Sequence, residues 1–222
     1  MQLTFSYLQP AFGVVENTLS KARLARYLIE AGGDPHYALR LYVWNASLCQ
    51  ALYLPVQICE VAVRNALHGA LVRKIGPNWH EVEAFRRTLP AQLRGLLDDA
   101  IARERIDYGA RMTVDHVVSG LSFGFWQNLL TARYDGMLWP QSFAQSFPKK
   151  PTTVSRELLY KHIDKFRILR NRLAHHKPIF DRGPSIEYLN MLQIVSWICP
   201  DTAWLMRHLS RVAQTINSRP KS

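Results

Sequence analysis

The segment LYKHIDKFRILRNRLAHHKP, residues 159–178, decides the fold because it joins a helical repeat of apolar residues to a cluster of polar groups at one end. The apolar residues recur at helical spacing and form a stripe that faces a core, made of Leu159, Ile163, Phe166, Leu169 and Leu173. We expect this helix to begin near Thr152 or Thr153. Pro178 should close it, because proline cannot continue the ladder of helical hydrogen bonds.

Arg170 falls inside this apolar stripe. A guanidinium does not lose its charge in a protein, so Arg170 needs either an anionic ligand or several protein acceptors there. Asn171 and His175 are four residues apart and share a neighbouring face of the helix, with Arg167 one turn earlier. The C-terminal end of the helix is therefore expected to bring an arginine, an amide and an imidazole close together.

These groups suit the cleavage of a phosphodiester. An imidazole such as His175 can take a proton from a ribose 2′-hydroxyl or give one to a leaving oxygen. A fixed arginine can hold the scissile phosphate by two hydrogen bonds. Because RNA carries its own nucleophile, no metal ion is required. In the alternative interpretation, Arg170 pairs with a buried acid or caps carbonyls, and the histidines lie in solvent at a helix C-terminus, where cations are favoured.

The string RNRLAH, residues 170–175, resembles the Arg-(four to six residues)-His signature of HEPN ribonucleases, including the asparagine that often follows the arginine. Longer strings resemble segments of the Abi-like (abortive infection) family of that superfamily, namely RNRLAHHKPIF at 170–180, YVWNASLCQALYLPVQICEVAVRNALH at 42–68 and VVSGLSFGFWQNLL at 117–130. Lys177 departs from the pattern, since many members carry an acidic residue there. This departure makes the site more basic.

The resemblance implies an all-α, HEPN-like helical bundle with endoribonuclease activity in a toxin or in phage defence. It implies that Arg170, Asn171 and His175 are catalytic, that no cofactor is needed, and that two motifs face each other in a homodimer. His176 is a candidate substitute for His175 or a second proton carrier. The alternative is a non-catalytic RNA-binding or scaffold module regulated by a partner RNA or an antitoxin. A hydrolytic metal site made of His162, His175 and His176 is disfavoured, because carboxylate ligands are scarce nearby.

Residues 56–75 predict a second core helix that is apolar almost all round. Its polar exceptions form one stripe, made of Gln57, Glu60, Arg64 and His68. Either Glu60 pairs with Arg64 one turn later, or one of the two lies beside Arg170 and supports the site, as the resemblance also implies. The string RNALH at 64–68 repeats the motif with an interval one residue shorter, and we interpret it as a support element.

The net charge of +11 favours an anionic partner. Residues 149–182 contain ten lysines and arginines against three acids, so this segment supplies +7 of that charge. A solvated basic face is the ordinary explanation of such a run. Because the run coincides with the candidate site, we expect RNA to be the partner and its binding to weaken steeply with salt. The candidate RNA-binding residues are Lys161, Lys165, Arg167, Arg172 and Lys177.

The chain of 222 residues, 48% of them hydrophobic, is long and apolar enough for one globular domain. We expect a single all-helical domain over residues 1–222, with residues 1–33 as an N-terminal extension. Three cysteines, an odd number and widely spaced, argue against a disulfide or zinc framework. We find no apolar run of transmembrane length and no signal-peptide layout in residues 1–20, so we expect a cytoplasmic protein.

Cap and breaker residues predict the remaining elements. A helix over residues 20–31 should be followed by one that starts at Asp34-Pro35 and is kinked or divided at Pro55. Further helices are expected over 90–106, from Thr113 to a break near Gly120 and on to Arg133, over 185–198, and over 200–216. Residues 135–150 should form a long loop.

Overall fold

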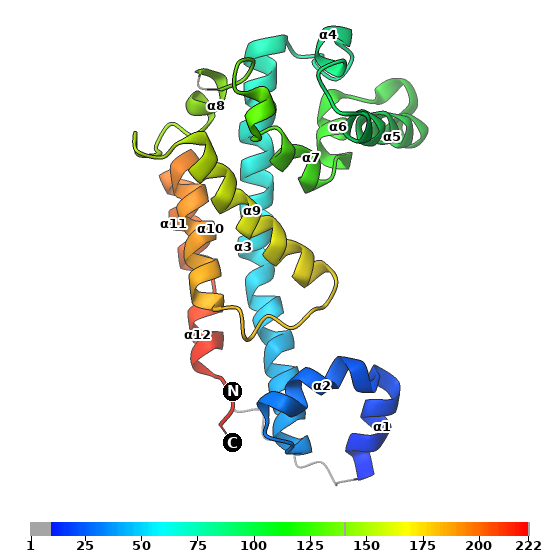
Figure 1. Ribbon diagram of the computed structural model, residues 1–222, viewed down its shortest axis with the longest axis vertical. Coiled ribbons are helices and arrows are strands. Elements are labelled where there is room, and N and C mark those ends of the chain that lie inside the picture. Colours follow the sequence, from blue (N-terminus) through cyan, green and yellow to red (C-terminus); the bar gives the residue numbers. More distant parts are fainter. Residues whose placement is uncertain (1–9, 140, 222) are drawn as a thin grey trace.

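The axis of the fold is α3, Pro35–Ile75, a single helix of 41 residues (Figure 1). The computed structural model describes residues 10–139 and 141–221, and all secondary structure in that part of the chain is helical. The all-α class is therefore confirmed. Asp34 caps α3 by accepting a hydrogen bond from the backbone N–H of His36, as expected for Asp-Pro at a helix start.

The helix runs through Pro55, so of the two outcomes expected there, a kink or a division, the division is wrong. Buried residues on both sides of the proline, Leu52 and Cys59, hold the two halves of α3 in the core. This packing outweighs the loss of one backbone hydrogen bond at the proline. The two helices expected on either side of Pro55 are thus one element.

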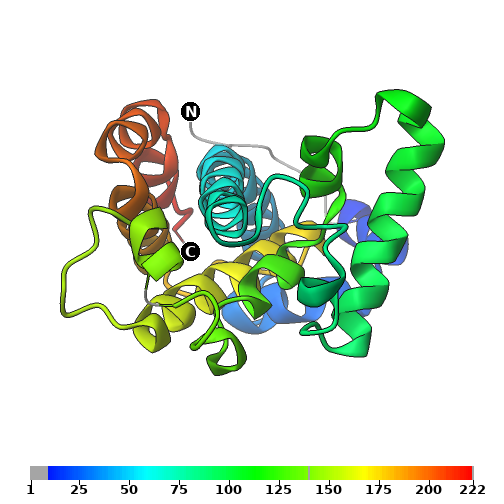
Figure 2. The same cartoon turned by 90° about the horizontal axis from the view of Figure 1, so that it is seen from above.

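Shorter helices surround α3. Seen from above, α3 lies between α10–α12 on one side and α5–α7 on the other, with α9 crossing next to it (Figure 2). The helices that pack directly on α3 include α2 Lys21–Glu30, α7 Phe123–Asn128, α8 Gln141–Ser146, α10 Pro184–Ile198 and α12 Val212–Asn217. The other helices are α1 Pro10–Leu19, α4 Glu83–Arg86, α5 Ala91–Tyr108, α6 Val114–Gly120, α9 Arg156–Ala174 and α11 Pro200–Leu209. Short 3-10 turns cover Gly109–Arg111 and Ala132–Tyr134.

The apolar stripe of α9 enters the core as expected. Leu159, Ile163, Phe166 and Leu169 are buried, whereas Leu173 is only partly buried. The helix begins at Arg156 and not at Thr152 or Thr153, because the Ser155 hydroxyl accepts a hydrogen bond from the backbone N–H of Leu158 at 3.1 Å. The sequence therefore predicts the buried face of α9 correctly and its first residue incorrectly.

Three other boundaries differ from expectation. The helix expected to reach Arg133 ends at Asn128, whose carbonyl accepts a hydrogen bond from the Thr131 hydroxyl. The expected loop over 135–150 contains α8. The last expected helix is divided into α11 and α12, because the hydroxyl of Ser210 accepts the backbone N–H of Val212 and starts a new helix. The expected break near Gly120 is confirmed, and a Cβ at Gly120 would lie 2.5 Å from Oε1 of Glu104.

The expected N-terminal extension packs on α3 through α2. Ser20 caps α2 by accepting the backbone N–H of Arg23, which confirms the predicted start of this helix. Residues 1–9 of the extension lie outside the described residues.

By length and composition α3 is apolar enough to cross a membrane. An 18-residue window within it has a mean hydropathy of 1.4, and 28% of that window is buried. The expectation that no apolar run reaches this length is therefore wrong for α3. The same helix carries much of the core and is packed by helices around it, as the central helix of a helical bundle is.

Candidate active site

The candidate site lies where α9 ends. His175 is the last residue with near-helical geometry, and His176 follows in the left-handed conformation at φ 52°. The backbone N–H of Lys177 bonds to the Arg172 carbonyl at 2.8 Å, and that of His176 bonds to the Leu173 carbonyl at 3.0 Å. These two bonds form a Schellman motif, in which glycine usually occupies the position of His176. The helix therefore ends before Pro178, and the expectation that proline closes it is wrong.

The turn after α9 is held by Arg172 of α9 itself and by Asn45 of α3. Nε and Nη2 of Arg172 donate to the Pro178 carbonyl at 3.2 and 2.5 Å. The buried amide of Asn45 on α3 accepts the next two backbone N–H groups, those of Ile179 and Phe180, at 2.9 and 3.2 Å. The two histidines are thus presented by a fixed turn. Asn45 went unnoticed in the sequence, where its signal was a lone amide in an apolar helical row.

The N-terminal helix α2 also contacts this turn. Arg23 donates a hydrogen bond to the His176 carbonyl, and Arg26 forms an ion pair with Asp181. Residues of the expected extension therefore contact and support the candidate site, although the basic side of α2 was the only feature of the sequence that hinted at these contacts.

Arg170 pairs with Glu60 across the space between α9 and α3. Its Nε donates to Oε2 of Glu60 at 3.0 Å and its Nη2 donates to Oε1 at 3.5 Å. The Arg170 side chain is 35% exposed and that of Glu60 is 19% exposed, so the pair is only partly shielded from water. The acid expected for Arg170 is therefore Glu60. Asn171 accepts a hydrogen bond from Nη1 of Arg170 at 3.4 Å.

Arg64 lies on the same side of α3 as Glu60 but has other partners. Its Nη1 donates to the carbonyls of Ser119 at 3.1 Å and Val118 at 3.5 Å, near the C-terminal end of α6. The alternative in which Glu60 pairs with Arg64 along the helix is therefore wrong, because Arg170 takes up the carboxylate. A polar residue of α3 does lie beside Arg170, as the other alternative expected.

A cleft of about 710 Å³ opens between α3 and the end of α9. Its polar wall includes Glu60, Arg64, Arg170 and His176, and its apolar wall includes Tyr53, Val56 and Leu173. Tyr53 is 69% exposed, so an aromatic side chain is open to a ligand in the cleft that two arginines also line. The cleft thus combines permanent positive charge with an apolar wall.

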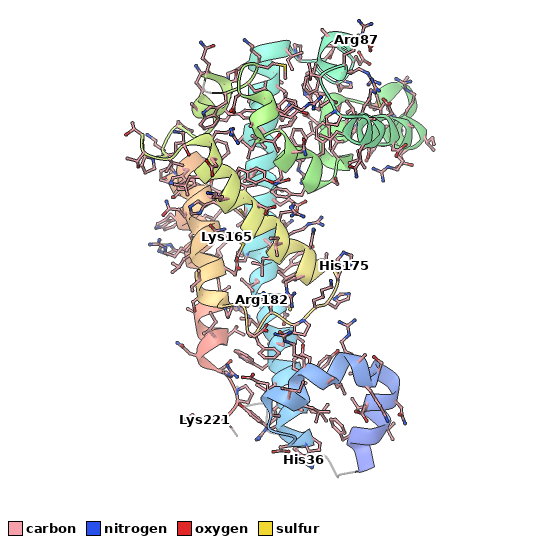
Figure 3. The ribbon with its side chains drawn as sticks, viewed as in Figure 1. His36, Arg87, Lys165, His175, Arg182 and Lys221 are labelled. Atoms are coloured by element: carbon pink, nitrogen blue, oxygen red, sulfur yellow. The ribbon has the colours of Figure 1, made fainter. Side chains whose placement is uncertain are left out.

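The two histidines occupy different places. His176 lines the cleft, whereas His175 is exposed at the end of α9 (Figure 3). Asn171 and His175 were expected to share one face of the helix. His175 is instead the C-cap residue just after the helix, although its backbone N–H still bonds to the Asn171 carbonyl. The structure therefore brings Arg170 and His176 together at the cleft, with Asn171 hydrogen-bonded to Arg170 and His175 next to His176 in the chain.

The basic candidates of α9 divide into two groups. Arg167 pairs with Asp164, Lys161 pairs with Glu157, and Arg172 holds the Pro178 carbonyl. Lys165 and Lys177 are exposed and form no ion pair within the described part of the chain. These two lysines are the candidates with the most freedom to contact a phosphate backbone.

The histidines considered as metal ligands do not gather. Nδ1 of His162 lies 2.6 Å from Oδ1 of Asn190 on α10, and its ring packs edge-on against Trp197. Among the residues that the structure describes, no three His, Cys, Asp or Glu side chains are arranged to hold a metal ion.

Comparison of the chain with protein family models, with curated proteins and with solved structures finds no match.

Proposed function

We propose that the chain is a metal-independent endoribonuclease that acts in the cytoplasm as a toxin or a phage-defence (abortive infection) effector. The cleft at the end of α9 carries the proposal, because Arg64, Arg170 and His176 line one hollow on a strongly basic chain. Fixed guanidinium groups suit the binding of a phosphate, and an imidazole can transfer a proton near neutral pH. The resemblance of residues 170–180 to the Abi-like family supports the same chemistry.

In this proposal Arg170 binds the scissile phosphate. Its pair with Glu60 fixes the guanidinium plane, and Asn171 holds the same group from its other side. His175 accepts the proton of the ribose 2′-hydroxyl, and the 2′-oxygen then forms a bond to phosphorus. The bond from phosphorus to the 5′-oxygen breaks, and His176 protonates that oxygen. The products are a 2′,3′-cyclic phosphate and a 5′-hydroxyl.

In the same proposal two chains form a HEPN-like homodimer with RNA between them. A cleft that is open to solvent and an exposed His175 are compatible with a substrate that extends beyond one chain. RNA between the subunits would also screen the repulsion of two basic segments. An antitoxin or a regulatory RNA is the neutralising partner that this kind of effector requires.

Two observations favour a second function, that of a non-catalytic RNA-binding or scaffold module. Two nitrogens of Arg170 already donate to Glu60, and His175 is exposed next to the cleft. An arginine that only completes an ion pair, beside histidines in solvent, would bind RNA without cleaving it.

Incubation of the purified full chain with total RNA in EDTA distinguishes these two functions. Cleavage is followed on a denaturing gel, and binding is followed by a gel shift at several salt concentrations. The endoribonuclease proposal predicts new RNA fragments in EDTA and their loss in the Arg170→Ala variant. Salt-sensitive binding without fragments would contradict that proposal and would favour the binding module.

A further inference from the structure

A second hollow adjoins the cleft and shares Val61 and Arg64 with it. Its volume is about 520 Å³, and it lies between the middle of α3 and α6, with His68 on one wall and Asp115 on the other. This volume is within the range of pockets that hold small organic groups. Because the hollows share two wall residues, they lie next to each other along α3.

Arg64 forms a fixed partition between the two hollows. Its hydrogen bond to the Ser119 carbonyl anchors the guanidinium at the end of α6. The charges on the two sides of this partition differ. The first cleft has two arginines, Arg64 and Arg170, against the single carboxylate of Glu60, whereas in the second hollow Arg64 alone faces the carboxylate of Asp115. A phosphate is therefore favoured more in the first cleft, and a group with N–H donors is favoured more in the second hollow.

His68 adds a hydrogen-bond donor to the second hollow. The indole N–H of Trp79 donates to Nδ1 of His68 at 3.0 Å. An indole nitrogen can only donate, so the neutral His68 ring carries its proton on Nε2. Burial lowers the pKa of His68 below its ordinary value, although the charge of Asp115 opposes this shift. His68 is therefore suited to donate a hydrogen bond to a ligand and not to accept a proton.

We propose that this second hollow, lined by His68 and Asp115, binds the base of the nucleotide next to the one at Arg170. This inference depends on the proposed function in one respect only, which is that the ligand is RNA. The Asp115 carboxylate accepts N–H groups, so it selects bases with an exocyclic amine, such as cytosine, over uracil, which presents a carbonyl oxygen at that position. Asp115 is thus a specificity-determining residue, and His68 donates to an acceptor on the same base edge.

Cytidine and uridine oligomers provide the matched pair of ligands, because the two bases differ in this amine and have almost the same shape. We would use short, fluorescently labelled 2′-O-methyl oligomers, which lack the nucleophile, so that binding is measured apart from cleavage. Fluorescence anisotropy of the full-chain protein should show the cytidine oligomer bound about tenfold more tightly. Equal affinities for the two oligomers, or binding of neither, would overturn the proposal.

The Asp115→Asn variant tests the residue itself. It should bring the ratio of the two affinities close to one, because an amide no longer requires a donor from the base. Asp99→Asn on α5 removes the same charge from an exposed position and should keep the wild-type ratio. An unchanged ratio in Asp115→Asn would overturn the assignment.

Cleavage of unmodified RNA, measured on the same proteins, separates this inference from the ribonuclease proposal. Discrimination that depends on Asp115, with no cleavage, would contradict the ribonuclease and support the base-binding hollow. Cleavage with no discrimination between the two oligomers would support the ribonuclease and contradict the base-binding hollow.

Discussion

The chain contains two similar strings, RNALH at 64–68 and RNRLAH at 170–175, with very different surroundings. In α3 the shorter interval keeps Arg64 and His68 one turn apart inside a continuous helix, where each has a protein partner. In α9 the extra residue carries His175 to the end of the helix, and a left-handed His176 follows. Similar residue types are therefore fixed by protein partners within one helix and lie on an exposed turn at the end of the other.

The difference shows that the end of a helix decides what these groups can do. His68 is half-buried, and its Nδ1 is occupied by Trp79. His175 and His176 are exposed on a turn that Asn45 and Arg23 hold in place. The imidazoles that follow α9 can therefore transfer a proton to or from a ligand, whereas His68 is suited only to donate a hydrogen bond, and each of the following changes tests that distinction.

Removal of both imidazoles from the end of α9 should have the largest effect. If they transfer the protons, RNA cleavage by His175→Ala/His176→Ala should fall by about 10²–10⁴-fold, the usual contribution of general acid–base catalysis. The measurement is the single-turnover cleavage rate of one RNA. His208→Ala, an exposed histidine on α11, is the matched control and should retain the wild-type rate. His68→Ala should mainly raise the RNA concentration needed for half-maximal rate. A double variant as active as the wild type would contradict the assignment.

Removal of either arginine of the cleft, Arg170 or Arg64, should lower the cleavage rate less than removal of both imidazoles does, and the two losses should differ. Arg170→Ala should lower the cleavage rate by about 10²–10³-fold, as the loss of a group that stabilises charge on the reacting phosphate does. Arg64→Ala should lower it by only about tenfold, since Arg64 lies on α3 next to α6, whereas Arg170 lies on the helix that ends at the two histidines. The same single-turnover assay compares them, and equal losses would contradict the distinction.

A second variant separates phosphate binding by Arg170 from simple neutralisation of Glu60. Arg170→Ala/Glu60→Gln removes both charges of the pair, so no unpaired carboxylate remains in the cleft. The activity should stay lost, while thermal unfolding should show a folded protein. Recovery of the activity in this double variant would mean that Arg170 only balances Glu60.

His176→Gly should separate the stability of the turn from its chemistry. Glycine adopts the left-handed conformation without the steric cost that histidine has, so the free energy of unfolding should stay the same or rise by up to about 1 kcal/mol. Cleavage should nevertheless fall, because the imidazole in the cleft is lost. Denaturant unfolding measures the first quantity. A variant that is less stable than the wild type would show that the histidine side chain itself holds the turn.

The smallest expected effect is on the pH dependence of stability. Burial lowers the pKa of His68 and of His80 below the ordinary value of 6.5. The unfolded chain then binds more protons than the folded chain below pH 6.5, so the free energy of unfolding should fall as the pH falls through that range. Glu187, whose pKa is raised by burial, acts in the opposite direction. Denaturant unfolding of the wild type and of His68→Gln isolates the histidine, and identical pH profiles would contradict its role.

Local sequence signals predicted much of the fold. The caps at Ser20 and Asp34 and the apolar stripe of α9 behave as expected, because each depends on interactions within a few residues or on one helical period. Pro55 does not follow its local preference, since tertiary packing on both sides keeps α3 continuous. The continuity of α3 could therefore not be predicted from local sequence signals.

The candidate site was predictable in its residue types but not in its pairing. The polar stripe of α3 identified Glu60, yet only the crossing of α9 over α3 decides that Arg170 and not Arg64 takes its carboxylate. The residue that ends α9 in the left-handed conformation is a histidine, His176, where glycine is usual. The sequence therefore has no glycine at this position to indicate the end of the helix. Asn45 and Arg23 support the turn from distant parts of the chain, and neither the lone amide nor the basic side of α2 indicates which segment it contacts.

The chemistry of the RNA ends tests the proposed reaction most directly. Total RNA is incubated in EDTA with the wild type and with His175→Ala, and the new termini are mapped. Attack by the 2′-hydroxyl at the end of α9 predicts 2′,3′-cyclic phosphate and 5′-hydroxyl termini for the wild type and their loss in the variant. Termini with 3′-hydroxyl and 5′-phosphate groups, or cyclic phosphates formed equally well by His175→Ala, would contradict it.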